Sequence, residues 1–228
     1  RGEVARLGDE VELEQVPQAG TGPDNYGYLN RIASIEGQLY VCGFRRQVCI
    51  RRDGRWQRFD AGMLEPLSAR GSSFEAMDGI ASDCIYAVGS GGQIWHYDGK
   101  AWRQCASPTN VDLHEVHCVS RDRVLVVGQR GVVLVGALDS WTTTVDPDFD
   151  EDLWGVAEFK GEVYLAGYGG LGRLRPGGVD VLDPGLGRGV LGYRLRMQGG
   201  LLWSIGNDDI LCFDGKRWTE VVCPDNVP

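Results

Sequence analysis

The chain has 228 residues, a formal net charge of −9 and 43% hydrophobic residues, a composition typical of globular and not of disordered proteins. The acidic balance argues against nucleic acid as a direct partner, because phosphate binding needs basic side chains; it suits a basic protein partner or simple solubility. No apolar run approaches the ~20 residues that cross a bilayer, so we expect no membrane span.

A short glycine-centred phrase recurs along the chain and predicts a repeat architecture. Its glycines are spaced 46, 39, 39 and 39 residues apart, at Gly43, Gly89, Gly128, Gly167 and Gly206. Self-similarity at such a period indicates one supersecondary unit stacked several times.

The clearest unit is Phe74–Val111, in which four apolar or alternating segments are separated by turn residues. The turns fall at Ser82-Asp83, Ser90-Gly91-Gly92 and Asp98-Gly99, and an Asp-Gly pair is a strong hairpin signal. The unit is therefore predicted to be a four-stranded antiparallel meander.

The same order of segments predicts a single all-β domain with five complete blades and an N-terminal half blade. The blades are expected at residues 26–73, 74–111, 112–151, 152–189 and 190–228, and residues 1–25 match the outer half of another. Apolar first strands and polar fourth strands are typical of a β-propeller. A half blade would leave an open sheet edge. We therefore expect further residues before Arg1, with six blades as the simplest count and seven as the alternative.

The fourth strands carry a recurrent aromatic residue that we expect to pack between blades. It is found in four of the five units, as Trp56, Trp102, Trp141 and Trp218.

The seven cysteines lie mostly inside apolar strand patterns, which predicts buried free thiols and a cytoplasmic protein. One disulfide stays open as an alternative. Cys42 and Cys49 would face each other if the hairpin between them turned at Arg45-Arg46.

The phrase Val-Gly-x-x-Gly-x-Ile-x-x-x-Asp-Gly-x-x-Trp, found in Val88–Trp102, resembles the repeats of bacterial propellers of the YVTN and BNR types. Asp98–Trp102 and Asp214–Trp218 also resemble the Asp-box turn of sialidase-type propellers, although the residue between Asp and Gly is absent and no preceding Ser is in register. The resemblance covers nearly the whole chain and implies the fold. Proteins with such repeats include enzymes, lectins, assembly factors and toxin-neutralising proteins.

An acidic segment, Asp146–Asp152, connects two of the predicted blades. It carries five carboxylates in seven positions, which repel one another unless a cation or a basic surface is near. Three interpretations stay open: a solvated loop, a contact for a cationic protein, or a calcium site. The calcium candidates are the alternating residues Asp146, Asp148, Asp150 and Asp152, but the segment lacks the glycine and the distal glutamate of an EF-hand loop.

We predict no catalytic site and no cofactor. His114 and His117 are three residues apart in a predicted strand, so they point to opposite faces and cannot share a zinc ion in the way that helical i, i+4 histidines do. The cysteines show no C-x-x-C spacing. The glycine-rich stretches precede no predicted helix, so they are not phosphate loops.

Loops between blades and turns between second and third strands emerge on one face of a propeller, which we predict to be the partner-binding face. Two of its members, Met63 and Leu67, belong to the inter-blade insertion Asp60–Ser73, which either contacts a partner or folds onto its own blade. The candidate residues are Arg45, Arg46, Met63, Leu67, Asp148, Asp150, Glu151, Trp154, Tyr168 and Arg188.

Acidic charge, free thiols and the lack of a catalytic motif together favour a non-catalytic propeller that binds another protein. The most specific form of this hypothesis is a bacterial immunity protein that neutralises a cognate, basic toxin. The alternatives are a glycan-binding or glycan-hydrolysing, sialidase-like propeller and an assembly or scaffold factor. A sialidase-like site would need an arginine trio with a tyrosine and carboxylates near the axis.

Overall fold

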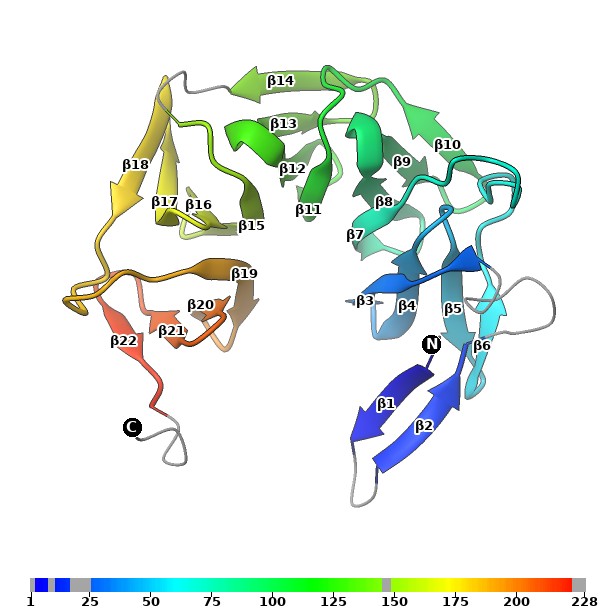
Figure 1. Ribbon diagram of the computed structural model, residues 1–228, viewed down its shortest axis with the longest axis horizontal. Coiled ribbons are helices and arrows are strands. Elements are labelled where there is room, and N and C mark those ends of the chain that lie inside the picture. The colour runs from blue at the N-terminus through cyan, green and yellow to red at the C-terminus, as the bar shows by residue number, and fades with distance from the viewer. Residues whose placement is uncertain (1–2, 8–10, 17–25, 145–148, 223–228) are drawn as a thin grey trace.

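The computed structural model describes residues 3–7, 11–16, 26–144 and 149–222. These residues form one two-stranded and five four-stranded antiparallel sheets, which follow one another around a common centre in an open arc (Figure 1). Between Leu29 and Val222 the described residues contain no α-helix, only the 3-10 turns η1 (Ser90–Gly92) and η2 (Gln129–Gly131). None of the helical segments described is long and apolar enough to span a bilayer.

The five four-stranded sheets are blades 1 to 5 in chain order, and in each the four strands are neighbours in sequence order. Blade 1 contains β3 (Leu29–Ile35), β4 (Gln38–Gly43), β5 (Val48–Arg52) and β6 (Arg55–Arg58). Blade 2 contains β7 (Phe74–Ala81), β8 (Cys84–Gly89), β9 (Ile94–Tyr97) and β10 (Trp102–Cys105). Blade 3 contains β11 (Leu113–Ser120), β12 (Arg123–Gly128), β13 (Val133–Ala137) and β14 (Ser140–Thr144). Blade 4 contains β15 (Leu153–Phe159), β16 (Glu162–Gly167), β17 (Gly170–Arg175) and β18 (Gly178–Leu182). Blade 5 contains β19 (Gly192–Gln198), β20 (Leu201–Gly206), β21 (Ile210–Phe213) and β22 (Trp218–Glu220). The N-terminal hairpin, β1 (Glu3–Leu7) and β2 (Val11–Gln15), forms the two-stranded sheet.

The glycines that signal the repeat have one structural reason in common. Each ends the second strand of its blade and lies against the carbonyl oxygen of the residue that precedes the first strand. A Cβ atom at any of the five would stand no more than 2.5 Å from that oxygen, which no side chain tolerates without a backbone shift. The recurrent glycine therefore fixes the close approach of the first two strands in each blade.

The core is divided among the interfaces between successive sheets. Buried side chains of each blade pack against those of the next, for example Tyr40 of blade 1 with Phe74 and Met77 of blade 2, and Leu125 of blade 3 with Leu153 and Val156 of blade 4. Each blade thus completes the core of its neighbour, the arrangement that a stacked repeat requires.

The four fourth-strand tryptophans occupy equivalent strands, as predicted: β6, β10, β14 and β22. The indole N–H of Trp102 donates to the carbonyl of Phe59 in the preceding blade at 2.7 Å. Trp141 meets Tyr86 of the preceding blade edge to face. Trp218 stacks on Phe213, whose ring contacts Phe159 of blade 4. These aromatic rings therefore connect neighbouring blades.

The six cysteines within the described residues are all free thiols, and Cys223 lies outside them. The expectation that Cys42 and Cys49 would face each other is wrong. Cys42 is paired with Val48 and Cys49 with Val41, so the two thiols lie on opposite faces of the sheet. Cys42 belongs to the core between blades 1 and 2, and Cys49 to the core between blade 1 and the hairpin.

Candidate functional site

The first strand of every blade carries a β-bulge at its second residue, near the centre of the arc. The pairing registers skip one residue in β3, β7, β11, β15 and β19, at Asn30, Glu75, His114, Trp154 and Tyr193. A bulge bends the strand locally and re-aims the side chains beside it. Two groups of candidate residues, one charged and one aromatic, include side chains at or directly after the bulges of blades 1, 3, 4 and 5.

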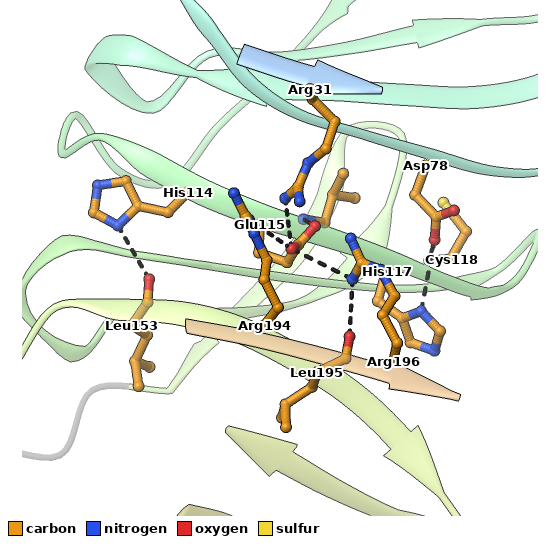
Figure 2. A network of polar contacts seen from close by, with 11 residues as sticks. Arg31, Asp78, His114, Glu115, His117, Cys118, Leu153, Arg194, Leu195 and Arg196 are labelled. Atoms are coloured by element: carbon orange, nitrogen blue, oxygen red, sulfur yellow. Dashed lines mark hydrogen bonds and ion pairs between the residues drawn. The ribbon is translucent and has the colours of Figure 1, made fainter. Parts of the chain in front are cut away.

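The charged group consists of Arg31, Glu115, Arg194 and Arg196, which we call the axial cluster (Figure 2). Three guanidinium groups converge on Oε2 of the buried Glu115. Arg31 of blade 1 lies 2.5 Å from it, and Arg194 and Arg196 of blade 5 lie at 3.1 and 3.5 Å. Arg31, Glu115 and Arg194 are each the residue that follows a bulge.

The intervening blades leave room for these side chains. The equivalent residues of blades 2 and 4 are Ala76 and Gly155. Small residues alternate with charged ones around the centre, so long side chains from blades 1, 3 and 5 can meet there (Figure 2).

The axial cluster holds more positive than negative charge. Burial away from water lowers the pKa of Arg194, and the nearby charge of Arg31 lowers it further. The Nε atom of Arg31 is buried and has no hydrogen-bond partner among the residues that the structure describes. Three arginines near the centre are one part of what a sialidase-like site needs, but here all three converge on one buried glutamate.

A cavity of about 430 Å³ adjoins the cluster. Its lining comes from the middle and end of the first strands, and its polar members are Ser34, Asp78, His117, Arg196 and Gln198. Within it, Nδ1 of His117 lies 3.6 Å from Asp78, whose carboxylate also accepts the backbone N–H of Cys118 at 2.7 Å.

The aromatic group consists of His114, Trp154, Tyr168 and Tyr193, which we call the aromatic cluster. The rings of His114 and Trp154 stack at 3.8 Å with an angle of 3° between their planes. Tyr168 meets Trp154 and Tyr193 edge to face, at 6.1 and 5.5 Å between centroids. A hydrogen bond with Tyr168 raises the pKa of Tyr193. Tyr168, in the turn between β16 and β17, keeps 52% of its surface exposed.

His114 and His117 are the second and fifth residues of β11; His114 belongs to the aromatic cluster and His117 to the cavity lining. Within the described residues, no three His, Cys, Asp or Glu side chains are grouped so that they could hold a metal.

Glu151 of the acidic segment lies beside the aromatic cluster; Asp146 and Asp148 are outside the described residues. The carboxylate of Glu151 lies against Gly169, next to Tyr168: a Cβ on that glycine would stand 2.5 Å from Oε2. Asp150 is exposed and lies 3.5 Å from Arg130.

Asp152 has a structural role that the repeat explains. Its carboxylate accepts the backbone N–H of Arg130 in the turn of blade 3, just as Asp112 accepts that of Gly91 in the turn of blade 2. Both aspartates directly precede a first strand, so they tie it to the turn of the blade before.

The insertion Asp60–Ser73 folds onto its own blade and holds the neighbouring arginines. Arg45 donates to the carbonyls of Pro66 and Ala69, and Arg46 lies 3.2 Å from Glu65. Met63 is only 2% exposed and packs in the core between blades 1 and 2. The prediction of Met63 as a contact residue is therefore wrong, because a partner cannot reach it. Leu67 remains 55% exposed.

Arg188, the last candidate, is held within blade 5. Its guanidinium contacts the carboxylates of Asp209 and Glu220. Of the ten candidates, the structure thus brings Glu151, Trp154 and Tyr168 together, with Asp150 next to Glu151 in the chain and beside Arg130, and places the rest elsewhere or outside the described residues.

Solved structures with the same fold include proteins of different function. Virginiamycin B lyase from Staphylococcus aureus superposes with a TM-score of 0.74 at 12% identity, covering 98% of this chain and 78% of that one. YCF48 bound to D1 peptide superposes with a TM-score of 0.65 at 15% identity, covering 98% and 71%. At such low identity these likenesses show the propeller fold alone.

No family model matches the chain. The immune protein Tsi7 of Pseudomonas aeruginosa is 36% identical over 224 residues, which are 97% of this chain and 73% of that protein. This identity extends across all five blades and the hairpin. The chain therefore belongs to the family of the immune protein Tsi7 and is an immunity protein.

Proposed function

We propose that this immunity protein neutralises a cognate toxin by binding it, without chemistry of its own, on the surface formed by the aromatic cluster and the acidic residues beside it. One observation carries the proposal: Tyr168 is half exposed, yet its ring is fixed by Trp154 and Tyr193 from two different first strands. Relatedness to an immune protein supports the class of function.

A supported, exposed aromatic side chain is a favourable binding anchor. Tyrosine and tryptophan dominate binding hot spots because they bury a large area and keep a polar handle. The ring of Tyr168 already rests on two others, so it loses little conformational freedom when a partner covers it.

The charge around the cluster favours a basic toxin. Asp150 and Glu151 are exposed on the loop that leads into β15, and Arg130 is the cation that the structure places beside Asp150. Carboxylates at the rim of an interface steer a cationic partner toward it. The same charge disfavours nucleic acid as a direct ligand.

The test is the affinity of the purified protein for its cognate toxin, measured by isothermal titration calorimetry. Tyr168→Ala should weaken binding by at least about 2 kcal/mol, or roughly thirtyfold. Tyr28→Ala is the matched control, because Tyr28 is an exposed tyrosine before β3 in blade 1. Equal affinities for the two variants would refute the proposed surface.

The N-terminal hairpin is proposed to be the outer half of a further blade, in a ring of six. Trp56 of blade 1 packs with Val16, which follows β2, and its indole N–H donates to Glu14 at 3.0 Å. Trp102 of blade 2 likewise packs against Phe59, the residue that follows β6 of blade 1, and its indole N–H donates to the backbone carbonyl of that residue. The hairpin thus has the position of third and fourth strands relative to blade 1, and Figure 1 shows it continuing the arc.

A cytoplasmic location is proposed from the thiols. The six described cysteines are free and five of them are buried, the state that a reducing compartment maintains.

A further inference from the structure

The axial cluster has an excess of cationic groups that the toxin-binding proposal does not use. Three arginines share a single carboxylate oxygen, in a protein whose net charge is −9. Because all three guanidinium groups lie within 3.5 Å of the same oxygen, they are close to one another. Neighbouring like charges raise the free energy of the folded protein unless a counter-charge is near. Glu115 supplies one negative charge against three positive ones, so the cluster alone carries a surplus of two.

One donor in the cluster is buried and unused. The side chain of Arg31 is 7% exposed, and its Nε–H has no partner while its Nη2 binds Glu115. A buried donor without an acceptor is costly, and native structures nearly always supply one from protein, water or ligand. The unpaired Nε–H is a second observation, independent of the charge count, that points to a missing acceptor.

A ligand can reach the axial cluster from the cavity beside it, which is lined by the first strands. The cavity volume of about 430 Å³ is within the range that holds small molecules. Arg196 forms part of its lining and contacts Glu115, so it joins the cavity to the cluster, in which Arg31 is buried and Arg194 and Arg196 are partly exposed. Ser34, His117 and Gln198 supply further polar groups on the walls, and a carboxylate of the lining, that of Asp78, lies 3.6 Å from His117 and accepts the backbone N–H of Cys118.

We propose that Arg31, Arg194 and Arg196 form a binding site for an oxyanion, a carboxylate or phosphate group, at the centre of the propeller. Guanidinium groups bind such anions through short, charge-assisted hydrogen bonds in a fixed planar geometry. Glu115 holds the three arginines in place and competes with the anion for them. The site uses different side chains from the toxin-binding surface, although Glu115 and Arg194 directly follow His114 and Tyr193 in their strands, so the two proposals are tested with different variants.

The experiment measures anion binding by the protein alone. Inorganic phosphate and citrate are titrated by calorimetry at constant ionic strength, with chloride as the balancing anion. Wild-type protein should bind at one site per chain. Arg194→Gln and Arg196→Gln should each weaken binding at least about tenfold, because each removes a charge-assisted contact. Arg121→Gln is the control, since Arg121 is an exposed arginine paired with Asp83 away from the centre; it should bind as the wild type does.

A second variant tests the competition. Glu115→Gln keeps the shape of the side chain and removes the internal counter-charge. Its melting temperature should rise more on adding citrate or phosphate than that of the wild type, because the ligand then supplies the only negative charge. This readout holds even if the variant is less stable without anion. An anion response equal to that of the wild type would overturn the role given to Glu115 and, with it, the site.

A third experiment measures toxin capture by the same arginine variants and decides whether the oxyanion is a free small anion or an acidic side chain of the toxin. If free anions bind and Arg196→Gln captures toxin normally, the ligand is a free small anion. If free anions do not bind but Arg194→Gln and Arg196→Gln weaken toxin capture at least about tenfold while Arg121→Gln does not, an acidic side chain of the toxin occupies the site. If neither free anions nor the toxin responds to these variants, the proposal is overturned, and the toxin-binding surface is unaffected by that result.

Discussion

Replacing Trp102 with alanine tests the claim that fourth-strand tryptophans join one blade to the next. Trp102 is 9% exposed, its ring lies 5.9 Å from that of Phe59 and 5.4 Å from that of Tyr97, and its N–H donates to the Phe59 carbonyl. Truncating a buried tryptophan costs about 3–5 kcal/mol. Within that range, the carbonyl left without a donor accounts for about 1 kcal/mol.

Urea unfolding followed by far-UV circular dichroism measures this loss, because the signal does not depend on the tryptophan removed. The midpoint should fall while the slope with denaturant stays constant, since the same surface is exposed on unfolding. Trp102→Phe is the matched control: it keeps most of the ring contact, loses the hydrogen bond and should cost about 1–2 kcal/mol. A loss for alanine no larger than for phenylalanine would refute the inter-blade role of the ring.

Three further predictions concern the thiols, the hairpin and the acidic loop. In the native protein at pH 8 the buried thiol of Cys42, whose pKa burial raises to about 12, should resist alkylation, and half-buried Cys212 should react before the other five thiols that the structure describes. After denaturation without reductant all seven cysteines should titrate, and a lower count would contradict the free-thiol assignment. Arg51 donates two hydrogen bonds to Glu14 and lowers the pKa of that carboxyl below its ordinary 4.5, so this ion pair between the hairpin and blade 1 stabilises fully above pH 4.5 and is lost as the pH falls through the lower folded-state pKa. Glu14→Gln should weaken the contact already at pH 7 and speed amide exchange in β1 and β2; unchanged exchange would show that the ion pair does not hold the hairpin. The double variant Asp150→Asn, Glu151→Gln should associate severalfold more slowly with a basic toxin, with a flatter salt dependence and nearly unchanged folding stability; an unchanged association rate would show that these carboxylates lie outside the interface.

The repeat made the fold predictable, because its glycines are required by backbone contacts that local sequence reveals. Gly89 and Gly128 are 39 residues apart, and each must be glycine because it admits the carbonyl oxygen of the residue that precedes a first strand. Turn residues and alternating strands then gave all five four-stranded sheets. The fourth-strand tryptophans followed from the same alignment of units.

The axial cluster was missed, although the repeat contains its signal. The residue after the first bulge is Arg31 in blade 1, Glu115 in blade 3 and Arg194 in blade 5. Aligning the units by their glycines brings these three residues into register only when one extra residue is allowed in β11, which has a second bulge between Cys118 and Ser120. Charged residues at an otherwise apolar or small position of an inner strand indicate a central site. The contact itself joins residues 79 and 84 positions apart, and no local pattern records such a pairing.

Errors arose where tertiary contacts decide the outcome. Met63 lies in an inter-blade loop, yet the insertion folds back and buries it because Arg45 and Arg46 hold the loop to the blade. The proximity of Cys42 and Cys49 depended on the hairpin register, and a shift of one residue moves a side chain to the other face of the sheet.

Hydrogen–deuterium exchange of the complex with the cognate toxin tests the central claim most directly. Binding should slow exchange in the loop from Phe149 to Leu153, in the turn between β16 and β17 that carries Tyr168, and at the start of β19 around Tyr193. The Tyr168→Ala variant is measured with toxin at a concentration that saturates only the wild type. In this mixture the same segments should exchange as fast as in the free protein. Protection confined to the outer strands β14 and β18, with none at these three segments, would contradict the proposed toxin-binding surface.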